Sequence, residues 1–272
     1  MTKASEWAGA VGDVWAAEWV RTDRSFAGLA PALDAAILAA APERGRAVDL
    51  GCGAGSTALA LATARPGLAV TGVDLSPELI RVARGRGGST NLRFAQGDLA
   101  ADAELVAGAD LLFSRHGVMF FADPVAVFSR WRAAVAPGAR LVFTCFRDPA
   151  LNFWASDLIA TVTGRPPASP GIAPGPFAFA DANRVAAMLA NAGWTAMARA
   201  IDFRYVAGEG ADPVADAVGF FHRIGPIASA LRAAPEVDRP AMLARCTTAL
   251  ADHRHGHRVD FPAAAWLWTA TA

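Results

Sequence analysis

The sequence predicts an α/β fold in which a doubly wound, mostly parallel sheet of seven strands lies between layers of helices. Short apolar segments alternate with helical segments from about residue 46 to residue 147, which is the pattern of parallel strands joined by helices. Such connections are right-handed, so they place helices on both faces of the sheet. Hydrophobic residues make up 54% of the 272 residues and charged residues 18%, which is enough for a large core.

The individual elements follow from the apolar periodicity and from the residues that begin and end each segment. The predicted strands cover residues 46–51, 68–76, 91–98, 109–117, 139–148, 195–206 and 259–272. The predicted core helices cover residues 56–67, 76–87, 123–138 and 179–194. Ser76 followed by Pro77 is typical of a helix N-terminus.

Helical additions are predicted outside this core. Residues 1–45 are expected to form an N-terminal helical lid. The core then spans residues 46–205, with a proline-rich excursion at 148–176. A helical cap is predicted as an insertion at 206–258, before the final strand at 259–272.

Composition excludes several classes of partner. Basic and acidic residues number 25 each, so the chain lacks the basic excess of a nucleic-acid-binding protein. No apolar run approaches the roughly 20 residues that span a bilayer, and the N-terminal segment lacks the apolar stretch of a signal peptide, so no membrane insertion is expected. Three widely spaced cysteines indicate reduced thiols in a cytoplasmic protein. Apolar surface on the cap would support a homodimer.

A glycine-rich turn follows the first predicted strand. Gly51, Gly53 and Gly55 stand between an apolar run and a helix, where the absence of side chains lets backbone N–H groups touch a ligand. Asp74 ends the next strand, where a carboxylate can accept both hydroxyls of a ribose. Asp98 and Leu99 follow the third strand and are suited to the edge and face of a purine.

The charge of the turn indicates which nucleotide-like ligand it takes. A dinucleotide-binding turn has the pattern G-x-G-x-x-G, whereas Ser56 stands where its third glycine would be. Asp49 precedes the turn, so a pyrophosphate would meet a like charge and an ammonium or sulfonium group would be attracted. This favours S-adenosylmethionine over NAD.

These segments resemble class I S-adenosylmethionine-dependent methyltransferases, of the branch similar to the ubiquinone/menaquinone-biosynthesis methyltransferases, and within it an uncharacterised bacterial subgroup. The resemblance runs along nearly the whole chain and is carried by VDLGCGAGS, VTGVDLS, FAQGD, SRHGVMFF, NFW, GPFAFADANRVAAMLANAGW, FFHRIGP and PAAAWLWTA. It implies a Rossmann-like core and SN2 transfer of a methyl group from S-adenosylmethionine, with S-adenosylhomocysteine as product.

The resemblance also implies roles for individual residues of the cofactor site. Asp49 and the Gly51–Gly55 turn would hold the methionine part of S-adenosylmethionine, and Asp74 would take the ribose hydroxyls. Leu75 would lie against the adenine, whose exocyclic amine would bond to Asp98. Residues 114–116, beginning with Ser114, would border the reacting methyl group.

The acceptor side is less specific. His116 stands where the subgroup usually has a phenylalanine-like residue, so it is either a general base or a hydrogen-bonding residue. Methyl transfer depends more on alignment than on a base. Candidate acceptor-binding residues, in addition to His116, are the aromatic, apolar and cap side chains Trp15, Trp19, Met119, Trp154 and His222, and Trp7 shares the face of Trp15 and Trp19.

No metal site is predicted. His253, His255 and His257 stand at alternate positions, with Arg254 and Arg258 interleaved to repel a cation. No acidic or cysteine partner follows at matching spacing, which favours a solvated helix end.

The predicted function is therefore methyl transfer to a small-molecule or short-peptide acceptor, with carbon, oxygen and nitrogen nucleophiles all compatible. The alternatives are a nicotinamide-dependent oxidoreductase on the same sheet and a non-catalytic S-adenosylmethionine-binding protein.

Overall fold

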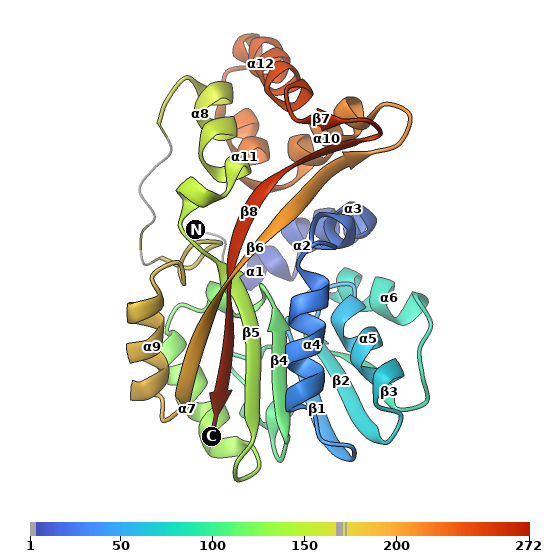
Figure 1. The fold of residues 1–272 in the computed structure, drawn as a ribbon, viewed down its shortest axis with the longest axis vertical. Helices are drawn as coiled ribbons and strands as arrows, with labels where there is room; N and C mark the ends of the chain where they lie inside the picture. The colour runs from blue at the N-terminus through green and yellow to red at the C-terminus, as the bar shows by residue number, and fades with distance from the viewer. Residues whose placement is uncertain (1–3, 167–170, 172) are drawn as a thin grey trace.

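One mixed sheet organises the computed structural model, which describes residues 4–166, 171 and 173–272 (Figure 1). The strand order is β3-β2-β1-β4-β5-β8-β6, and a two-residue strand, β7, pairs with β8. The first five strands are parallel, and β8 runs antiparallel to both β5 and β6. Their bounds are β1 Gly45–Leu50, β2 Leu68–Asp74, β3 Leu92–Gln96, β4 Leu111–Arg115, β5 Arg140–Phe146, β6 Thr195–Glu209, β7 Arg254–His255 and β8 Arg258–Thr271.

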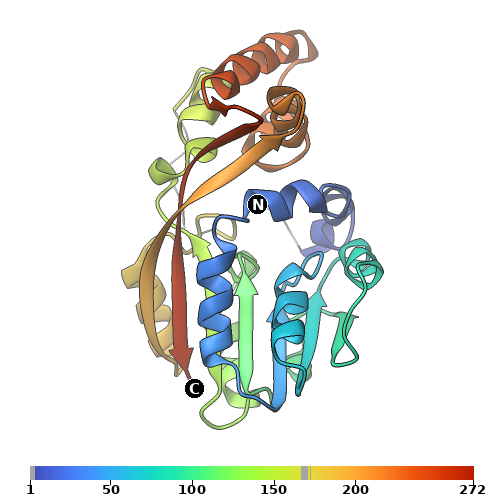
Figure 2. The same cartoon turned by 45° about the vertical axis from the view of Figure 1, so that its right-hand side comes forward.

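Helices cover both faces of this sheet, as the doubly wound prediction requires (Figures 1 and 2). On one face lie α4 Ala30–Ala40, α5 Ser56–Ala64 and α6 Pro77–Gly85. On the other lie α7 Pro124–Ala134 and α9 Ala182–Asn191. The α/β fold class is confirmed, with β7 as an addition to the seven predicted strands.

The strands β6 and β8 form a long antiparallel pair that extends beyond the core and carries the cap (Figure 2). The cap contains α10 Pro213–Arg223, α11 Gly225–Ala233 and α12 Arg239–Ala251. It also takes in α8 Asp157–Thr163 from the proline-rich excursion, which packs against α11 and α12. The cap is therefore built from two parts of the chain, whereas the sequence indicated one.

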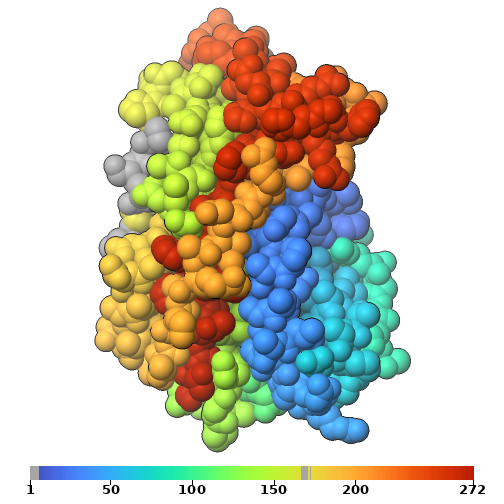
Figure 3. Space-filling view, viewed as in Figure 1, coloured from blue at the N-terminus to red at the C-terminus, as the bar shows by residue number. Residues whose placement is uncertain are grey.

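The N-terminal region is broken into short helices. They are α1 Ala4–Trp7, α2 Ala10–Ala17 and α3 Trp19–Ser25, followed by α4. The first three lie above the carboxyl ends of the parallel strands, between the core and the cap (Figure 2). Figure 3 shows a face on which this N-terminal segment sits directly beneath the cap.

Aromatic side chains fix the layers of the core. Phe143 of β5 stacks on Trp268 of β8 with ring centroids 6.1 Å apart. The buried Trp194 donates its indole N–H to the carbonyl of Phe128 in α7 at 3.0 Å. This bond satisfies the buried indole donor of Trp194.

Three smaller expectations can be compared with the structure. Cys52, Cys145 and Cys246 are buried free thiols. The run of alternating histidines lies in the turn around β7, after α12 has ended, so the expected helix end is wrong by a few residues. Among the described residues, no helix has the length and apolarity needed to cross a membrane.

Candidate functional site

The glycine turn at the end of β1 has a backbone that only glycine adopts without strain. Gly51, Gly53 and Gly55 have φ angles of +66°, +54° and +83°. A Cβ on Gly51 would lie 3.1 Å from Gly117, and one on Gly55 would lie 2.5 Å from the ring of Phe94. A Cβ on Gly53 would meet nothing within 4 Å. Gly51 and Gly55 are therefore needed for packing, whereas Gly53 borders open space that a ligand can enter.

Asp74, at the end of β2, is tied to this turn. Its carboxylate accepts the N–H of Gly53 at 2.9 Å on one oxygen and the N–H of Ser76 at 2.9 Å on the other. Burial raises the pKa of this carboxyl, and the two amides act in the opposite direction. Each oxygen keeps a lone pair for a further donor, such as a ribose hydroxyl.

Asp49, in β1, is a buried carboxylate without a hydrogen-bonding partner. Its side chain is 1% exposed, and neither carboxylate oxygen has a hydrogen bond of normal geometry among the described residues. Burial raises its pKa to about 8; the charge of Arg115 and the N–H of Ala58 lower it, while Asp74 raises it further. A cationic group beside Asp49 would satisfy it, so the chemistry here fits the ammonium or sulfonium of S-adenosylmethionine.

The predicted adenine contacts lie at the ends of β2 and β3. Leu75 is half-buried, directly after Asp74. Asp98 is half-buried and accepts the N–H of Ala100 at 2.9 Å. Leu99 is buried in the main core, and its carbonyl accepts the indole N–H of Trp131 at 3.0 Å. Leu75 and Asp98 are thus available to a ligand, and Leu99 serves packing.

Ser114, at the end of β4, holds the adjoining turns together. Its buried hydroxyl donates to the carbonyl of Leu50 at 2.6 Å and accepts the N–H of Gly117 at 3.1 Å. These bonds connect β1 and the segment after β4. The hydroxyl is therefore occupied by backbone groups, and its contribution to a ligand site is positional.

His116 directly follows β4 and is buried in an unusual backbone conformation. Its φ of +59° is positive, which non-glycine residues rarely adopt. Its Nδ1 lies 3.0 Å from the hydroxyl of Thr144, and Nε2 has no hydrogen-bond partner among the residues that the structure describes. Burial, followed by the charge of Arg115, lowers the pKa of His116 to about 3. The imidazole is therefore neutral at physiological pH.

Aromatic rings surround His116 and form what we call the aromatic cage. The His116 ring lies 4.2 Å from that of Phe146 and 4.8 Å from that of Phe26. Trp154 contacts the same Phe146 ring at 5.1 Å, and within the described part of the chain its buried indole N–H has no partner. The cage is defined by Phe26, Phe146, Trp154, Phe177 and Tyr205, joined by ring contacts to one another.

Trp15 and Trp19 of the lid pack beside the glycine turn. Both contact a small cluster that contains Ala54 of that turn. The guanidinium of Arg86 lies 4.3 Å from the centre of the Trp19 ring and donates to the carbonyl of Ala54. These two tryptophans therefore lie on the cofactor side of the site, whereas Phe26 of the lid belongs to the aromatic cage.

Ion pairs fasten the lid to the sheet. Asp23 of α3 binds Arg86 at 2.8 Å and Arg115, at the end of β4, at 2.7 Å. No local motif in the sequence marks these three residues, because the partners lie 63 and 92 positions apart.

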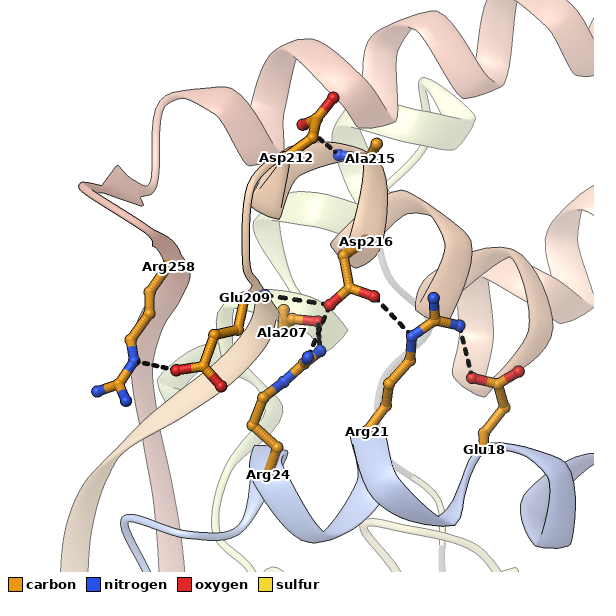
Figure 4. Close-up of polar contacts among 9 residues, drawn as sticks. All are labelled: Glu18, Arg21, Arg24, Ala207, Glu209, Asp212, Ala215, Asp216 and Arg258. Atoms are coloured by element: carbon orange, nitrogen blue, oxygen red, sulfur yellow. Dashed lines mark hydrogen bonds and ion pairs between the residues drawn. The ribbon is translucent and has the colours of Figure 1, made fainter.

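A second group of charges joins the lid to the cap (Figure 4). Asp216 of α10 binds Arg21 at 2.8 Å and Arg24 at 2.7 Å, both on α3. Arg24 also donates to the carbonyl of Ala207 in β6 at 2.7 Å. The buried Glu18 pairs with Arg21 at 2.8 Å. We call Arg21, Arg24 and Asp216 the lid–cap latch.

The remaining candidates lie apart from these groups. Met119 is buried, with its carbonyl accepting the N–H of Gly175. His222 is exposed on α10. A cavity in the cap, lined by residues that include Phe153 and Arg245, shares no residue with the glycine turn or the aromatic cage.

Comparison with known proteins agrees with this arrangement. Residues 48–143 match a family model described as a methyltransferase domain. The chain is 36% identical over 113 residues to the trans-aconitate 2-methyltransferase of Rhizobium meliloti, which covers 41% of this chain and 42% of that protein. It is 27% identical over 171 residues to the demethylmenaquinone methyltransferase of Deinococcus radiodurans, which covers 58% and 71%. The chain spans less than half the length of the trans-aconitate methyltransferases it matches.

A solved structure shows the same fold. The crystal structure of the YcgJ protein from Bacillus subtilis is similar with a TM-score of 0.55 at 18% identity, covering 89% of this chain and 97% of that one. The glycine turn, Asp49, Asp74, the second half of β1 and the strands β2, β3 and β4 all fall within the matched residues 48–143. The chain therefore contains, over residues 48–143, a methyltransferase domain similar to those of S-adenosylmethionine-dependent methyltransferases.

Proposed function

We propose that this protein transfers a methyl group from S-adenosylmethionine to a small-molecule or short-peptide acceptor. The observation that carries the proposal is the unsatisfied buried carboxylate of Asp49. It lies at the carboxyl edge of the sheet, next to a glycine turn that borders open space at Gly53. A buried anion without a partner is costly unless a cation neutralises it, so the site favours a positively charged ligand.

The residues around the glycine turn would each bind a different part of such a ligand. Asp49 would attract the ammonium group, and the Gly53 turn would leave room for the chain that bears it. Asp74 would accept the ribose hydroxyls on its remaining lone pairs, with Leu75 and Asp98 at the adenine. When bound, S-adenosylmethionine supplies an electrophilic methyl group on its sulfonium sulfur. The acceptor takes this methyl group in an SN2 reaction, and S-adenosylhomocysteine is the leaving group.

His116 would orient the acceptor through Nε2. A general base works best when its pKa lies near the working pH, and a histidine with a pKa of about 3 holds a proton poorly at neutral pH. A proton released by an O–H or N–H nucleophile would therefore pass on to water. Alignment supplies most of the acceleration in such a transfer.

The lid and cap would exclude water from the reacting groups. The latch supports this role because it holds both coverings together over the carboxyl edge of the sheet (Figure 4). The buried free thiols support a reducing, cytoplasmic location. The homodimer stays a prediction.

An oxidoreductase is the less favoured alternative. A nicotinamide dinucleotide would bring a pyrophosphate and no cation towards Asp49, so the buried carboxyl would be left without a counter-charge. A non-catalytic S-adenosylmethionine-binding protein would have the same crevice, and methyl transfer to an acceptor distinguishes it from the enzyme.

Calorimetric titration of the protein with S-adenosylhomocysteine, NAD⁺ and NADP⁺ tests the proposal. We expect one site for S-adenosylhomocysteine and none for the dinucleotides. Asp74→Asn should weaken binding by roughly 10- to 100-fold, because a hydrogen bond to a charged group contributes about 1.5–3 kcal/mol. The matched control Asp202→Asn removes an exposed carboxylate that pairs with Arg147 and should leave the affinity unchanged. An affinity of Asp74→Asn within twofold of the parent, or tight NAD⁺ binding, would count against the proposal.

A further inference from the structure

We propose that the aromatic cage is the acceptor subsite, and that it takes a flat, uncharged acceptor bearing a hydroxyl or carbonyl oxygen. This inference rests on the proposed function, because it names the substrate class of the same site. It is carried by the position of the cage, its ring geometry, its unsatisfied polar atoms and the pairing of the charges around it.

The cage adjoins the crevice of the glycine turn. Phe146 ends β5, and His116 follows β4, so both lie at the carboxyl edge where β1 leads into the turn. Gly117, next to His116, lies where a Cβ on Gly51 would be 3.1 Å away. His116 is therefore one residue from the backbone that packs against the glycine turn, so an acceptor beside His116 would lie next to the donor site.

The ring faces of the cage suit a flat molecule. Trp154 stacks on Phe177 with centroids 5.4 Å apart and planes 28° apart. Tyr205 stacks on Phe261 at 5.4 Å and 10°, which extends the aromatic surface into β8. Aromatic faces gain most from offset stacking on another planar group.

Two buried nitrogens require an oxygen from the ligand. The indole N–H of Trp154 and Nε2 of His116 have no partner among the described residues, and both side chains are more than nine-tenths buried. The indole can only donate, so its partner must be an acceptor such as a carbonyl or hydroxyl oxygen. A hydroxyl both donates and accepts, and it therefore suits Nε2 in either tautomer. A buried polar group is costly when it stays unpaired, so such a ligand relieves a penalty already present.

The cations beside the cage are already neutralised. Arg115, whose guanidinium lies 5.3 Å from the centre of the Phe26 ring, pairs with Asp23. Arg24 pairs with Asp216. Burial, opposed by Ser25 and Arg24, raises the pKa of Tyr205 to about 12, so its hydroxyl stays uncharged.

A carboxylate in this cage would be buried without a counter-charge. Recognition of carboxylates generally uses arginine in a bidentate pair, and neither Arg24 nor Arg115 is free for one. The cage therefore disfavours a polyanion such as trans-aconitate, for which several relatives are named.

The test titrates acceptor probes into the full-length protein saturated with S-adenosylhomocysteine. The probes are catechol and 2-naphthol, their carboxylated counterparts 3,4-dihydroxybenzoate and 3-hydroxy-2-naphthoate, and trans-aconitate. We expect at least one neutral probe to bind at least tenfold more tightly than its carboxylated counterpart, and trans-aconitate not to bind. Equal or tighter binding of the carboxylated probes or of trans-aconitate would overturn the inference, as would the absence of binding by both neutral probes.

Variants locate the probe in the cage. Trp154→Phe keeps a ring but removes the N–H, and it should weaken the binding of the neutral probe by about three- to tenfold while leaving the affinity for S-adenosylhomocysteine unchanged. Trp266→Phe is the control, because that indole donates to the carbonyl of Ala180 outside the cage. Equal effects of the two substitutions would overturn the assignment. Binding of S-adenosylhomocysteine is measured before any probe is added, so failure of the proposed function would appear separately.

Discussion

Asp49 and His116 carry opposite consequences of burial on the same edge of the sheet. Burial raises the pKa of the carboxyl to about 8 and lowers that of the imidazole to about 3, so each group is held towards its uncharged form. A cationic ligand favours the charged form of Asp49 and has no such effect on His116. The charge state of the site is therefore coupled to the donor.

This coupling predicts a pH dependence of donor binding. Below pH 8 the free protein holds a proton on Asp49, and an ammonium group beside the carboxylate expels it. The affinity for S-adenosylhomocysteine should therefore rise with pH, by up to about tenfold per unit between pH 6 and 7.5. Titration calorimetry in two buffers of different ionisation enthalpy measures the released proton. Asp49→Asn should bind weakly and without a pH slope, and a flat profile in the parent would contradict the coupling.

His116 should stay neutral across the physiological range. Its imidazole NMR signals, assigned by their loss in His116→Phe, should show no titration between pH 5 and 8. Because the unfolded chain takes up a proton at this histidine near pH 6.5 and the folded chain does not, stability should fall as the pH drops below about 6.5. A titration of the His116 signals near pH 6.5 would restore the role of general base.

At the scale of elements, the sequence predicted the parallel strands closely. Apolar runs ended by glycine or aspartate mark β1 to β5 because buried parallel strands have no polar face. The strand β6 was predicted to end at residue 206 and continues to Glu209, since its pairing with β8 passes an irregularity between Val206 and Gly208. The lid helices α2 and α3 are separated at Glu18, a buried carboxylate that pairs with Arg21 and Arg223, and periodicity reveals neither the break nor the ion pairs.

In the turn between β1 and α5, Gly53 borders open space for a ligand and Gly55 packs against Phe94, so substitutions at the two positions should have different effects. Gly53→Ala should weaken the binding of S-adenosylhomocysteine at least tenfold, with a stability loss of about 1 kcal/mol from its positive φ. Gly55→Ala should lose more stability, about 2–4 kcal/mol, because its Cβ would overlap the Phe94 ring. Chemical denaturation and calorimetry measure the two effects. Equal stability losses, or unchanged binding by Gly53→Ala, would contradict this assignment.

At the scale of the whole molecule, the lid and cap are one covering made from opposite ends of the chain. Arg21 and Asp216 lie 195 positions apart, and the aromatic cage combines Phe26, directly after α3, with side chains of β5, β6 and the segment between β5 and α9. Hydrophobic periodicity and short motifs do not predict contacts between residues so far apart in the sequence. Tyr205 is the only tyrosine of the chain, which is the one signal that could have singled out its position.

Breaking the latch should loosen this covering. Burial acts to raise the pKa of Asp216, but the N–H of Glu209 and the arginines Arg24 and Arg21 lower it overall. The contribution of Asp216 to stability is therefore present above about pH 4 and is lost only as the pH falls through its lowered folded value. Asp216→Asn should destabilise the protein by about 1–3 kcal/mol at pH 7.

The latch variant should also expose the lid to proteolysis. Thermal denaturation at pH 7 and pH 3, with limited proteolysis of the segment before α4, provides the measurements. The control is Asp202→Asn, whose carboxylate is 84% exposed and should contribute little. Equal stability of the two variants at pH 7 would show that the latch does not hold lid and cap together.

The central claim is that a positively charged adenosyl donor binds where β1 gives way to α5. A crystal structure of the protein with bound S-adenosylmethionine tests it most directly. We predict the ammonium group beside Asp49, the ribose on Asp74 and the methionine chain over Gly53. Crystals grown with the donor in excess that show a vacant crevice, or a dinucleotide pyrophosphate over Gly53 when NAD⁺ is supplied, would contradict the account.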